Sequence, residues 1–329
     1  MNKKTSKIEL AKALKGIKAV SSKEKYQQLL ESFLDIYGKD ELSNAIQGLS
    51  EEDEFALLTT LMRTASQIVG FEQRPLIKGD YIVPDFFMNF PKTKTTCLID
   101  VKSTKDMKYK IGGSYLRRLR NFSDVLGHPL YIAVRFVRAK KHAMWAIVKD
   151  TDRSRTTIHV EINDMINGER KNLWQEYILT PSPKMIVMAK FSKKAPSDSI
   201  HHDEIGSLIE LIVSDSFNTI NFQNPQASMV CGFLESYGLD VLKTEEIDDD
   251  LTMQYLQPTI FTSFLADIVY QVNRLVVDDD GSIIYDASKL LAHSDVGSCD
   301  DLIDRYAIEH IVQPLIDKNL LFIGAIGKP

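Results

Sequence analysis

The feature that most constrains the fold of this chain is a change in the spacing of apolar residues near residue 71. Before this point, apolar residues recur every three or four positions, which is typical of helices. After it come two short runs rich in β-branched and aromatic residues, separated by the polar turn PKTK: YIVPDFFMNF (81–90) and TTCLIDVK (95–102). The sequence therefore predicts helices first and paired strands next.

The order of the following segments predicts an α/β fold. Ser50 has the spacing of a helix N-cap, and the apolar stripe after it predicts a helix that ends at Gly70. The two strands come next, and a helix over 114–127 is followed by strands over 130–137 and 142–149. This order favours a mixed sheet flanked by helices, within residues 50–150.

The rest of the chain divides around this core. Residues 1–48 have helical periodicity and predict an N-terminal helical extension, and added strands extend the core region to 49–194. Four segments after it have the apolar spacing of helices, so we expect a mostly helical C-terminal domain over 195–329; the segments are 203–217, 225–238, 258–275 and 301–318.

Composition excludes several classes of protein. No window approaches 18 uninterrupted apolar residues, which argues against a transmembrane helix and a membrane partner. The basic start of the chain lacks the apolar stretch of a secretory signal. The cysteines, Cys97, Cys231 and Cys299, are scattered and odd in number, which argues against a disulfide scaffold or a cysteine zinc site. We therefore expect a cytoplasmic protein.

Two acidic residues mark the paired strands as a candidate site. Asp85 follows Pro84, and Asp100 and Lys102 lie two positions apart at the end of the second apolar run. Because side chains alternate faces along a strand, Asp100 and Lys102 project from the same face. If the two strands pair, Asp85 approaches Asp100, and two carboxylates and an ammonium group converge.

This group of side chains suits metal-assisted hydrolysis of a phosphodiester. Mg²⁺ prefers oxygen ligands, which Asp85, Asp100 and the backbone carbonyl of Val101 would supply, with Mn²⁺ as a possible substitute. A metal ion activates water and stabilises charge on the phosphate. Lys102 would orient the attacking water or stabilise the developing charge.

Pro84-Asp85 together with Asp100-Val101-Lys102 resembles the PD-(D/E)xK nuclease superfamily, which includes restriction endonucleases and Holliday-junction resolvases. The resemblance covers roughly residues 50–150 and implies a small αβββαβ core with the motif on adjacent strands. It also implies a glutamate on the first core helix, as a further catalytic and metal-binding group. Glu54 fits this role best, and Glu51, one turn earlier, remains an alternative.

Charge is unevenly distributed along the chain. The formal net charge is -5, but residues 92–141 carry 13 Lys and Arg against three Asp, a net of +10. Such a basic segment around two metal-binding carboxylates is what a polyanionic substrate requires. The candidate nucleic-acid-binding residues are Lys105, Lys108, Lys110, Tyr115, Arg117, Arg118 and Arg120. Solvated helix positions are the alternative for the three arginines.

The sequence thus favours a Mg²⁺-dependent endonuclease acting on DNA, with RNA not excluded. By analogy alone, restriction or antiviral defence is the expected setting, and a homodimer is expected from the family. Two alternatives stay open. One is a module that binds nucleic acid without cutting it, and the other is a nuclease subunit that is silent until a partner or ligand engages the C-terminal domain.

Overall fold

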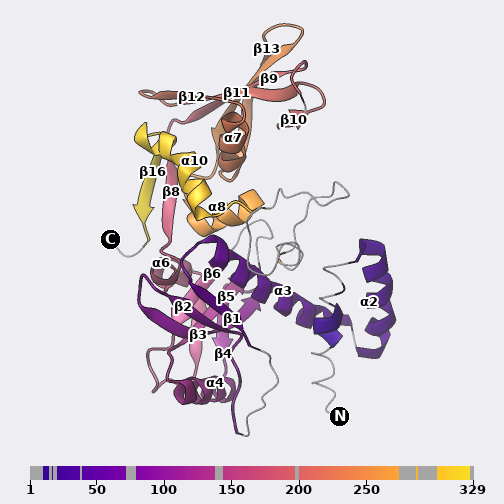
Figure 1. Ribbon diagram of the computed structural model, residues 1–329, viewed down its shortest axis with the longest axis vertical. Helices are drawn as coiled ribbons and strands as arrows, with labels where there is room; N and C mark the ends of the chain where they lie inside the picture. The colour runs from indigo at the N-terminus through magenta and orange to yellow at the C-terminus, as the bar shows by residue number, and fades with distance from the viewer. Residues whose placement is uncertain are drawn as a thin grey trace. The chain divides into compact units, whose positions relative to one another are not determined.

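The computed structural model describes residues 10–14, 17, 21–37, 39–71, 79–137, 144–196, 200–273, 287 and 302–326. The chain divides into two compact units (Figure 1). The first unit comprises Met1–Gln175, Asn273–Leu302 and Gly327–Pro329, and the second comprises Glu176–Val272 and Ile303–Ile326. In the described part of the chain, no helix is long and apolar enough to cross a membrane.

The first unit is built on a five-stranded mixed sheet with the strand order β1-β2-β3-β5-β6. Its central pair, β3 and β5, is parallel, and the other neighbouring pairs are antiparallel. The predicted α/β fold with a mixed sheet is confirmed. The strands are β1 (Gln67–Gly70), β2 (Phe86–Phe90), β3 (Thr95–Thr104), β5 (Leu130–Phe136) and β6 (Trp145–Lys149).

Burial patterns explain why these segments are strands. Every residue of β5 is buried, as expected for a central strand that is covered on both faces. By contrast, β2 alternates between buried and half-buried positions. The connection from β3 to β5 passes through β4 (Lys108–Ile111) and α4 (Gly113–Leu126), and β4 pairs with β7 (Ile158–Glu161) in a small second sheet. Two short helices, α5 (Asp164–Asn167) and α6 (Arg170–Leu173), complete this unit.

Helix α4 was predicted well because its signals are local. Leu116, Leu119 and Phe122 form its buried stripe, and Gly127 ends it with φ of 69°, a left-handed conformation that favours glycine. The N–H group of Gly127 donates to the carbonyl of Ser123, as in a typical helix C-terminus.

The helix before the sheet differs from the prediction at both ends. The structure has α2 (Lys23–Tyr37) and then α3 (Lys39–Leu61), which passes through Ser50. Ser50 is not an N-cap, because its hydroxyl donates to the carbonyl of Ile46, 3.1 Å away within the helix. The predicted end at Gly70 is also wrong, since Gln67–Gly70 is strand β1 on β2. The predicted boundary at residue 48 therefore falls inside one continuous helix.

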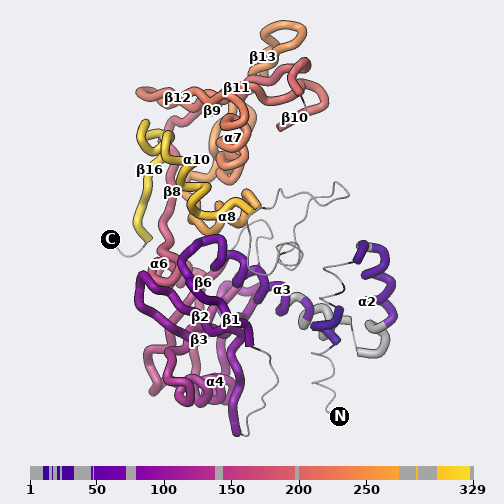
Figure 2. The backbone as a smooth tube through the Cα atoms, in the orientation of Figure 1, coloured from indigo at the N-terminus to yellow at the C-terminus, as the bar shows by residue number. Residues whose placement is uncertain are grey.

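The second unit contains a six-stranded antiparallel sheet with the order β10-β11-β9-β14-β13 and β12 paired to β11. A separate three-stranded sheet has the order β15-β8-β16, in which segments far apart in sequence lie side by side (Figure 2). The larger sheet consists of β9 (Ile186–Ser192), β10 (His201–His202), β11 (Gly206–Ser214), β12 (Thr219–Gln223), β13 (Leu239–Glu246) and β14 (Leu251–Pro258). The smaller one consists of β8 (Tyr177–Pro181), β15 (Ser263–Phe264) and β16 (Leu321–Ala325).

The prediction of a mostly helical domain over 195–329 is therefore wrong. Three predicted helices are present, as α7 (Gln226–Glu235), α8 (Leu265–Val272) and α10 (Arg305–Asp317). The segment 203–217 instead contains strand β11. A β-bulge between Leu208 and Glu210 interrupts its alternation, so buried Leu208 and Leu211 are three positions apart. That spacing imitates a helix in the sequence.

Candidate functional site

The pairing of β2 with β3 brings the two predicted acids together. Phe86 pairs with Ile99 in the antiparallel register, so Asp85 and Asp100 lie opposite each other just beyond the last pair. Oδ2 of Asp85 accepts a hydrogen bond from the N–H group of Val101 at 2.6 Å. The Asp85 carboxylate thus takes the place of a backbone carbonyl as the partner of β3. Both side chains are nearly inaccessible, with exposed fractions of 5% for Asp85 and 1% for Asp100.

Lys102 supplies the cation of this group. Its Nζ lies 2.8 Å from Asp100 Oδ2 and 3.9 Å from Asp85 Oδ2. The same ammonium donates to the carbonyl of Val101 at 2.7 Å. The side chain of Lys102 keeps 21% of its surface exposed, so the group is open to solvent through the lysine. Asp85, Asp100 and Lys102 are called the Lys102 cluster below.

Tyr115 of α4 completes the surroundings of the Lys102 cluster. Its hydroxyl donates to Asp100 Oδ1 at 3.0 Å, and its ring centroid lies 5.2 Å from the ammonium of Lys102. Burial raises the pKa of Tyr115 above its usual range, and the charge of Asp100 adds to this effect. The hydroxyl therefore stays protonated and remains a donor. Tyr115 thus contacts two members of the cluster, and its predicted role in nucleic-acid binding stays a prediction.

Charge in the cluster decides the protonation of Lys102. Burial lowers the pKa of Lys102, but the carboxylates of Asp100 and Asp85 outweigh burial and hold this pKa well above its usual range. Lys102 is therefore an ammonium ion at neutral pH. As an ammonium ion it can stabilise negative charge.

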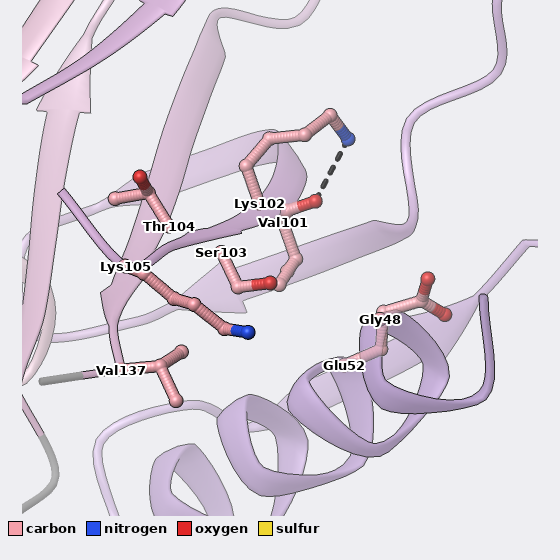
Figure 3. Close-up of a pocket in the computed structure, with 8 residues that line it drawn as sticks. All are labelled: Gly48, Glu52, Val101, Lys102, Ser103, Thr104, Lys105 and Val137. Carbon is pink, nitrogen blue, oxygen red and sulfur yellow. Dashed lines mark hydrogen bonds between the residues drawn. The ribbon is translucent and has the colours of Figure 1, made fainter. Parts of the chain in front are cut away.

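A pocket of about 570 Å³ opens at the end of β3. Val101 and Ser103 alternate with Asp100 and Lys102 along the strand and line this pocket, together with Lys102 itself. Figure 3 shows the carboxylate of Glu52, on α3, across the pocket from the side chains of Ser103 and Lys105. Gly48, Thr104 and Val137 complete the lining. Glu52, which the sequence did not single out, lines this pocket beside Lys102, whereas Asp85 and Asp100 are not part of the lining.

The two glutamates that were predicted for the site lie elsewhere. Arg135 of β5 donates through Nε to Glu54 Oε1 at 2.7 Å and lies 3.4 Å from Glu51 Oε2. The indole N–H of Trp145 donates to the same Glu54 oxygen at 2.8 Å. This buried group (Glu51, Glu54 and Arg135) is called the Arg135 cluster below. These interactions occupy Glu54 on the packed side of α3, and its role as a metal ligand stays a prediction.

The predicted basic surface is only partly available to a ligand. Arg120 donates to both oxygens of buried Asp150 at 2.7 Å, and these hydrogen bonds raise the pKa of its guanidinium. Arg117 and Arg118 pair with Asp80, each at 2.8 Å. Arg120 is therefore structural, while the Asp80 pairs join exposed side chains and can exchange.

The three predicted lysines lie at the surface of the first unit. Lys108 of β4 pairs with Glu161 of β7 at 2.7 Å, and both side chains are exposed. Lys105 and Lys110 are also exposed, and Lys105 lines the pocket beside Lys102. Of these residues, Lys105 is therefore the one that the structure brings to the candidate site.

The donor set of the Lys102 cluster fits a hard divalent cation. Oxygens of Asp85, Asp100 and Val101 converge on one positive charge, which here is the ammonium of Lys102. Oxygen ligands of this kind suit Mg²⁺ or Mn²⁺. Within the described part of the chain, no three His, Cys, Asp or Glu side chains gather closely enough to hold a metal ion. The cluster therefore offers two carboxylates and leaves further positions to water or substrate.

Comparison with known proteins adds little. No protein-family profile and no curated protein matches the chain. Among solved structures, the chain is similar to Hjc, a Holliday junction resolvase from the hyperthermophilic archaeon Archaeoglobus fulgidus. The two chains share 16% identity with a TM-score of 0.27, over 36% of this chain and 87% of that one. A TM-score of this size does not establish a shared fold, so the fold is assigned from the strand order of the sheet.

Proposed function

We propose that this protein is a metal-dependent endonuclease of the PD-(D/E)xK type that hydrolyses DNA phosphodiesters. The observation that carries the proposal is the convergence of oxygens from Asp85, Asp100 and Val101 on one cation, beside an open pocket. The two carboxylates are buried at a strand end, and the lysine beside them keeps an exposed surface, which gives a cation or a substrate a route to them.

In this proposal Asp85, Asp100 and the Val101 carbonyl hold Mg²⁺, with Mn²⁺ as a substitute. The bound ion would supply Lewis-acid chemistry and neutralise charge on the phosphate. Lys102 donates hydrogen bonds through its side-chain nitrogen to the attacking water or to a phosphate oxygen and stabilises negative charge there. Tyr115 fixes Asp100 through its hydroxyl and stabilises the Lys102 ammonium through its ring.

Among the glutamates of α3, Glu52 is the one proposed to act in the pocket, and it does not join Asp85 and Asp100 as a third metal ligand. It lines the same pocket as Lys102 and Lys105, whereas the other two glutamates pair with Arg135. We assign Glu52 to orienting water in the pocket, and Lys105 to contacting a phosphate beside the scissile one.

The finer parts of the proposal rest on analogy or on charge. DNA is preferred over RNA by family analogy, the basic segment 92–141 favours a polyanion, and a homodimer would suit cleavage of both strands. Restriction or antiviral defence remains the proposed setting by the same analogy, with a cytoplasmic location.

A second candidate function is nucleic-acid binding without cleavage. The protein would then be inactive as a nuclease either permanently or until a partner binds the second unit. The observation that favours it is the absence of a third acid beside Asp85 and Asp100 among the described residues. A partner or substrate would then have to complete the site.

One assay separates these candidates. The full chain is incubated with supercoiled, linear and single-stranded DNA and with RNA, in Mg²⁺ or in EDTA, and compared with Asp100→Ala. Asp106→Ala is the matched control, because Asp106 is an exposed residue followed by the same x-Lys pattern. We expect cleavage by wild type and the control in Mg²⁺ alone. Cleavage that survives EDTA or Asp100→Ala would sink the metal mechanism, and intact substrates throughout would favour the silent module.

A further inference from the structure

A second pocket of the first unit lies between α4 and the loop after β6 and has a volume of about 730 Å³. Its lining is unusually rich in guanidinium groups, and it contains a single carboxylate, that of Asp124. The pocket is separate from the Lys102 cluster. Tyr115 contacts the cluster and Arg117 lines the pocket, and residues two positions apart on a helix point to different sides. Its arginines are Arg117, Arg120, Arg153 and Arg155.

Arg120 shapes this pocket rather than offering a charge to it. Only 12% of its side chain is exposed, and it is held by Asp150. Its remaining N–H groups donate to the carbonyls of Asp152, Arg153 and Arg155 at 3.0, 3.2 and 2.7 Å. The loop therefore wraps around one guanidinium through its backbone, which allows the side chains of Arg153 and Arg155 to line the pocket.

The start of α4 fits closely against the end of this loop. A Cβ atom at Gly113 would lie 3.0 Å from the carbonyl oxygen of Thr156, which is closer than most Cβ contacts, so glycine suits this close approach. Ser114 in the first helical turn and Thr156 both line the pocket. Neutral hydroxyl donors thus stand next to the guanidinium groups.

Arg117 and Arg155 are paired by exposed carboxylates, and Arg153 pairs with exposed Asp124 at 3.1 Å and with buried Asp150 at 3.8 Å. The side chains of Arg117 and Asp80 are 66% and 55% exposed, those of Arg153 and Asp124 are 44% and 63%, and those of Arg155 and Asp152 are 74% and 46%. Exposed pairs of this kind contribute little and exchange readily with solvent or a ligand. Each guanidinium has five N–H donors, so a pair with one carboxylate leaves donors for an anion.

We propose that this pocket binds a phosphate group of the nucleic-acid backbone, away from the scissile one. Planar guanidinium groups match the oxygens of a phosphate in geometry and charge, and hydroxyl groups add neutral donors. The inference rests on the proposed function for its ligand, a phosphodiester chain. Free phosphate and small phosphate esters offer the same chemistry, so the test includes them.

The test measures binding of a labelled DNA duplex in EDTA, where cleavage does not interfere, over a series of salt concentrations. Arg153→Gln/Arg155→Gln should weaken binding by about tenfold per lost contact at 0.1 M salt and reduce the salt slope by roughly one for each. The control removes two exposed lysines outside the pocket, as Lys171→Gln/Lys184→Gln. Equal affinities and slopes in the two double variants would overturn the proposal.

Ser114→Asp tests the same pocket without a risk to folding. A carboxylate in the first turn of α4 is favourable to the helix, and the natural first turn has no acid. It nevertheless places a negative charge in the pocket. We expect weaker DNA binding at an undiminished thermal unfolding midpoint, and unchanged binding would count against the pocket.

Inorganic phosphate and a mononucleotide distinguish the possible ligands. Loss of their binding in Arg153→Gln/Arg155→Gln, with DNA affinity equal to that of the control, would assign the pocket to a small phosphate ester and overturn a role in backbone binding. Failure of the cleavage assay leaves these EDTA measurements unaffected, so the pocket and the nuclease activity are tested independently.

Discussion

Two groups of side chains in the first unit have the same charges and different surroundings. The Lys102 cluster and the Arg135 cluster each contain two carboxylates and one cation. In the Arg135 cluster, the side chain of Arg135 is 4% exposed and both glutamates are 10% exposed. In the Lys102 cluster the acids are buried equally well, but the lysine is 21% exposed and borders a pocket.

The two clusters differ in solvent access at the cation and not in the number of charges. Arginine cannot lose its proton and offers several donors in a plane, which suits a sealed group with indole and carboxylate partners. Lysine is a compact cation on a flexible side chain. The ammonium group of Lys102 can therefore move away from Asp85 and Asp100 without disrupting the packed core. Changes in the two clusters should therefore have opposite consequences for activity and stability.

The largest expected effect is on cleavage, in Asp100→Asn. The amide keeps the shape of the side chain and a partner for Tyr115 but removes the charge that a metal ion requires. We expect kcat to fall about 1,000-fold or more, while the unfolding free energy from urea titration changes far less than in an Arg135 variant. If the Asp100→Asn variant retained cleavage, the Lys102 cluster would be no more catalytic than its buried counterpart.

Arg135→Met should affect stability instead. It leaves Glu51 and Glu54 buried without their cation, and breaking such a group costs about 3–5 kcal/mol of unfolding free energy. Cleavage per folded molecule should be retained. The double variant Glu54→Gln/Arg135→Met should cost less than the sum of its single changes, because it also removes a stranded charge. Strict additivity would show that the two side chains do not interact as described.

Glu52→Gln tests which acid of α3 belongs to the site. Residues that orient water or ligands at a metal site typically contribute about 10- to 100-fold to activity, and we expect a loss of this size. Glu54→Gln is the matched control on the same helix and should lower the thermal midpoint with little change in kcat. The reverse pattern would restore Glu54 as the functional glutamate.

The smallest effect is expected for Tyr115→Phe, which removes one hydrogen bond to Asp100 and keeps the ring near Lys102. A loss of about 1 kcal/mol in unfolding free energy follows from that bond, with a severalfold decrease in kcat at saturating substrate. Tyr115→Leu also removes the ring and should lower kcat further. Identical kcat values for the wild type and both variants would show that Tyr115 does not position the cluster.

The sequence by itself determined the local features of this protein. Short runs rich in β-branched and aromatic residues located β2 and β3, and the polar turn between them suggested the pairing that brings Asp85 opposite Asp100. The spacing of Asp100 and Lys102 placed both on one face of a strand. Helix α4 and its end at Gly127 followed from an apolar stripe and a glycine. These features depend on neighbours in sequence, so a pattern suffices to predict them.

Tertiary structure decided the features that depend on distant partners. Gln67–Gly70 became a strand because β2 offered it a free edge, and a bulge in β11 disguised a strand as a helix. Glu54 was drawn to Arg135, 81 positions away, and Arg120 to Asp150, 30 positions away. A buried charged side chain needs an opposite charge that is buried beside it. Which charges are buried side by side is decided by the tertiary fold.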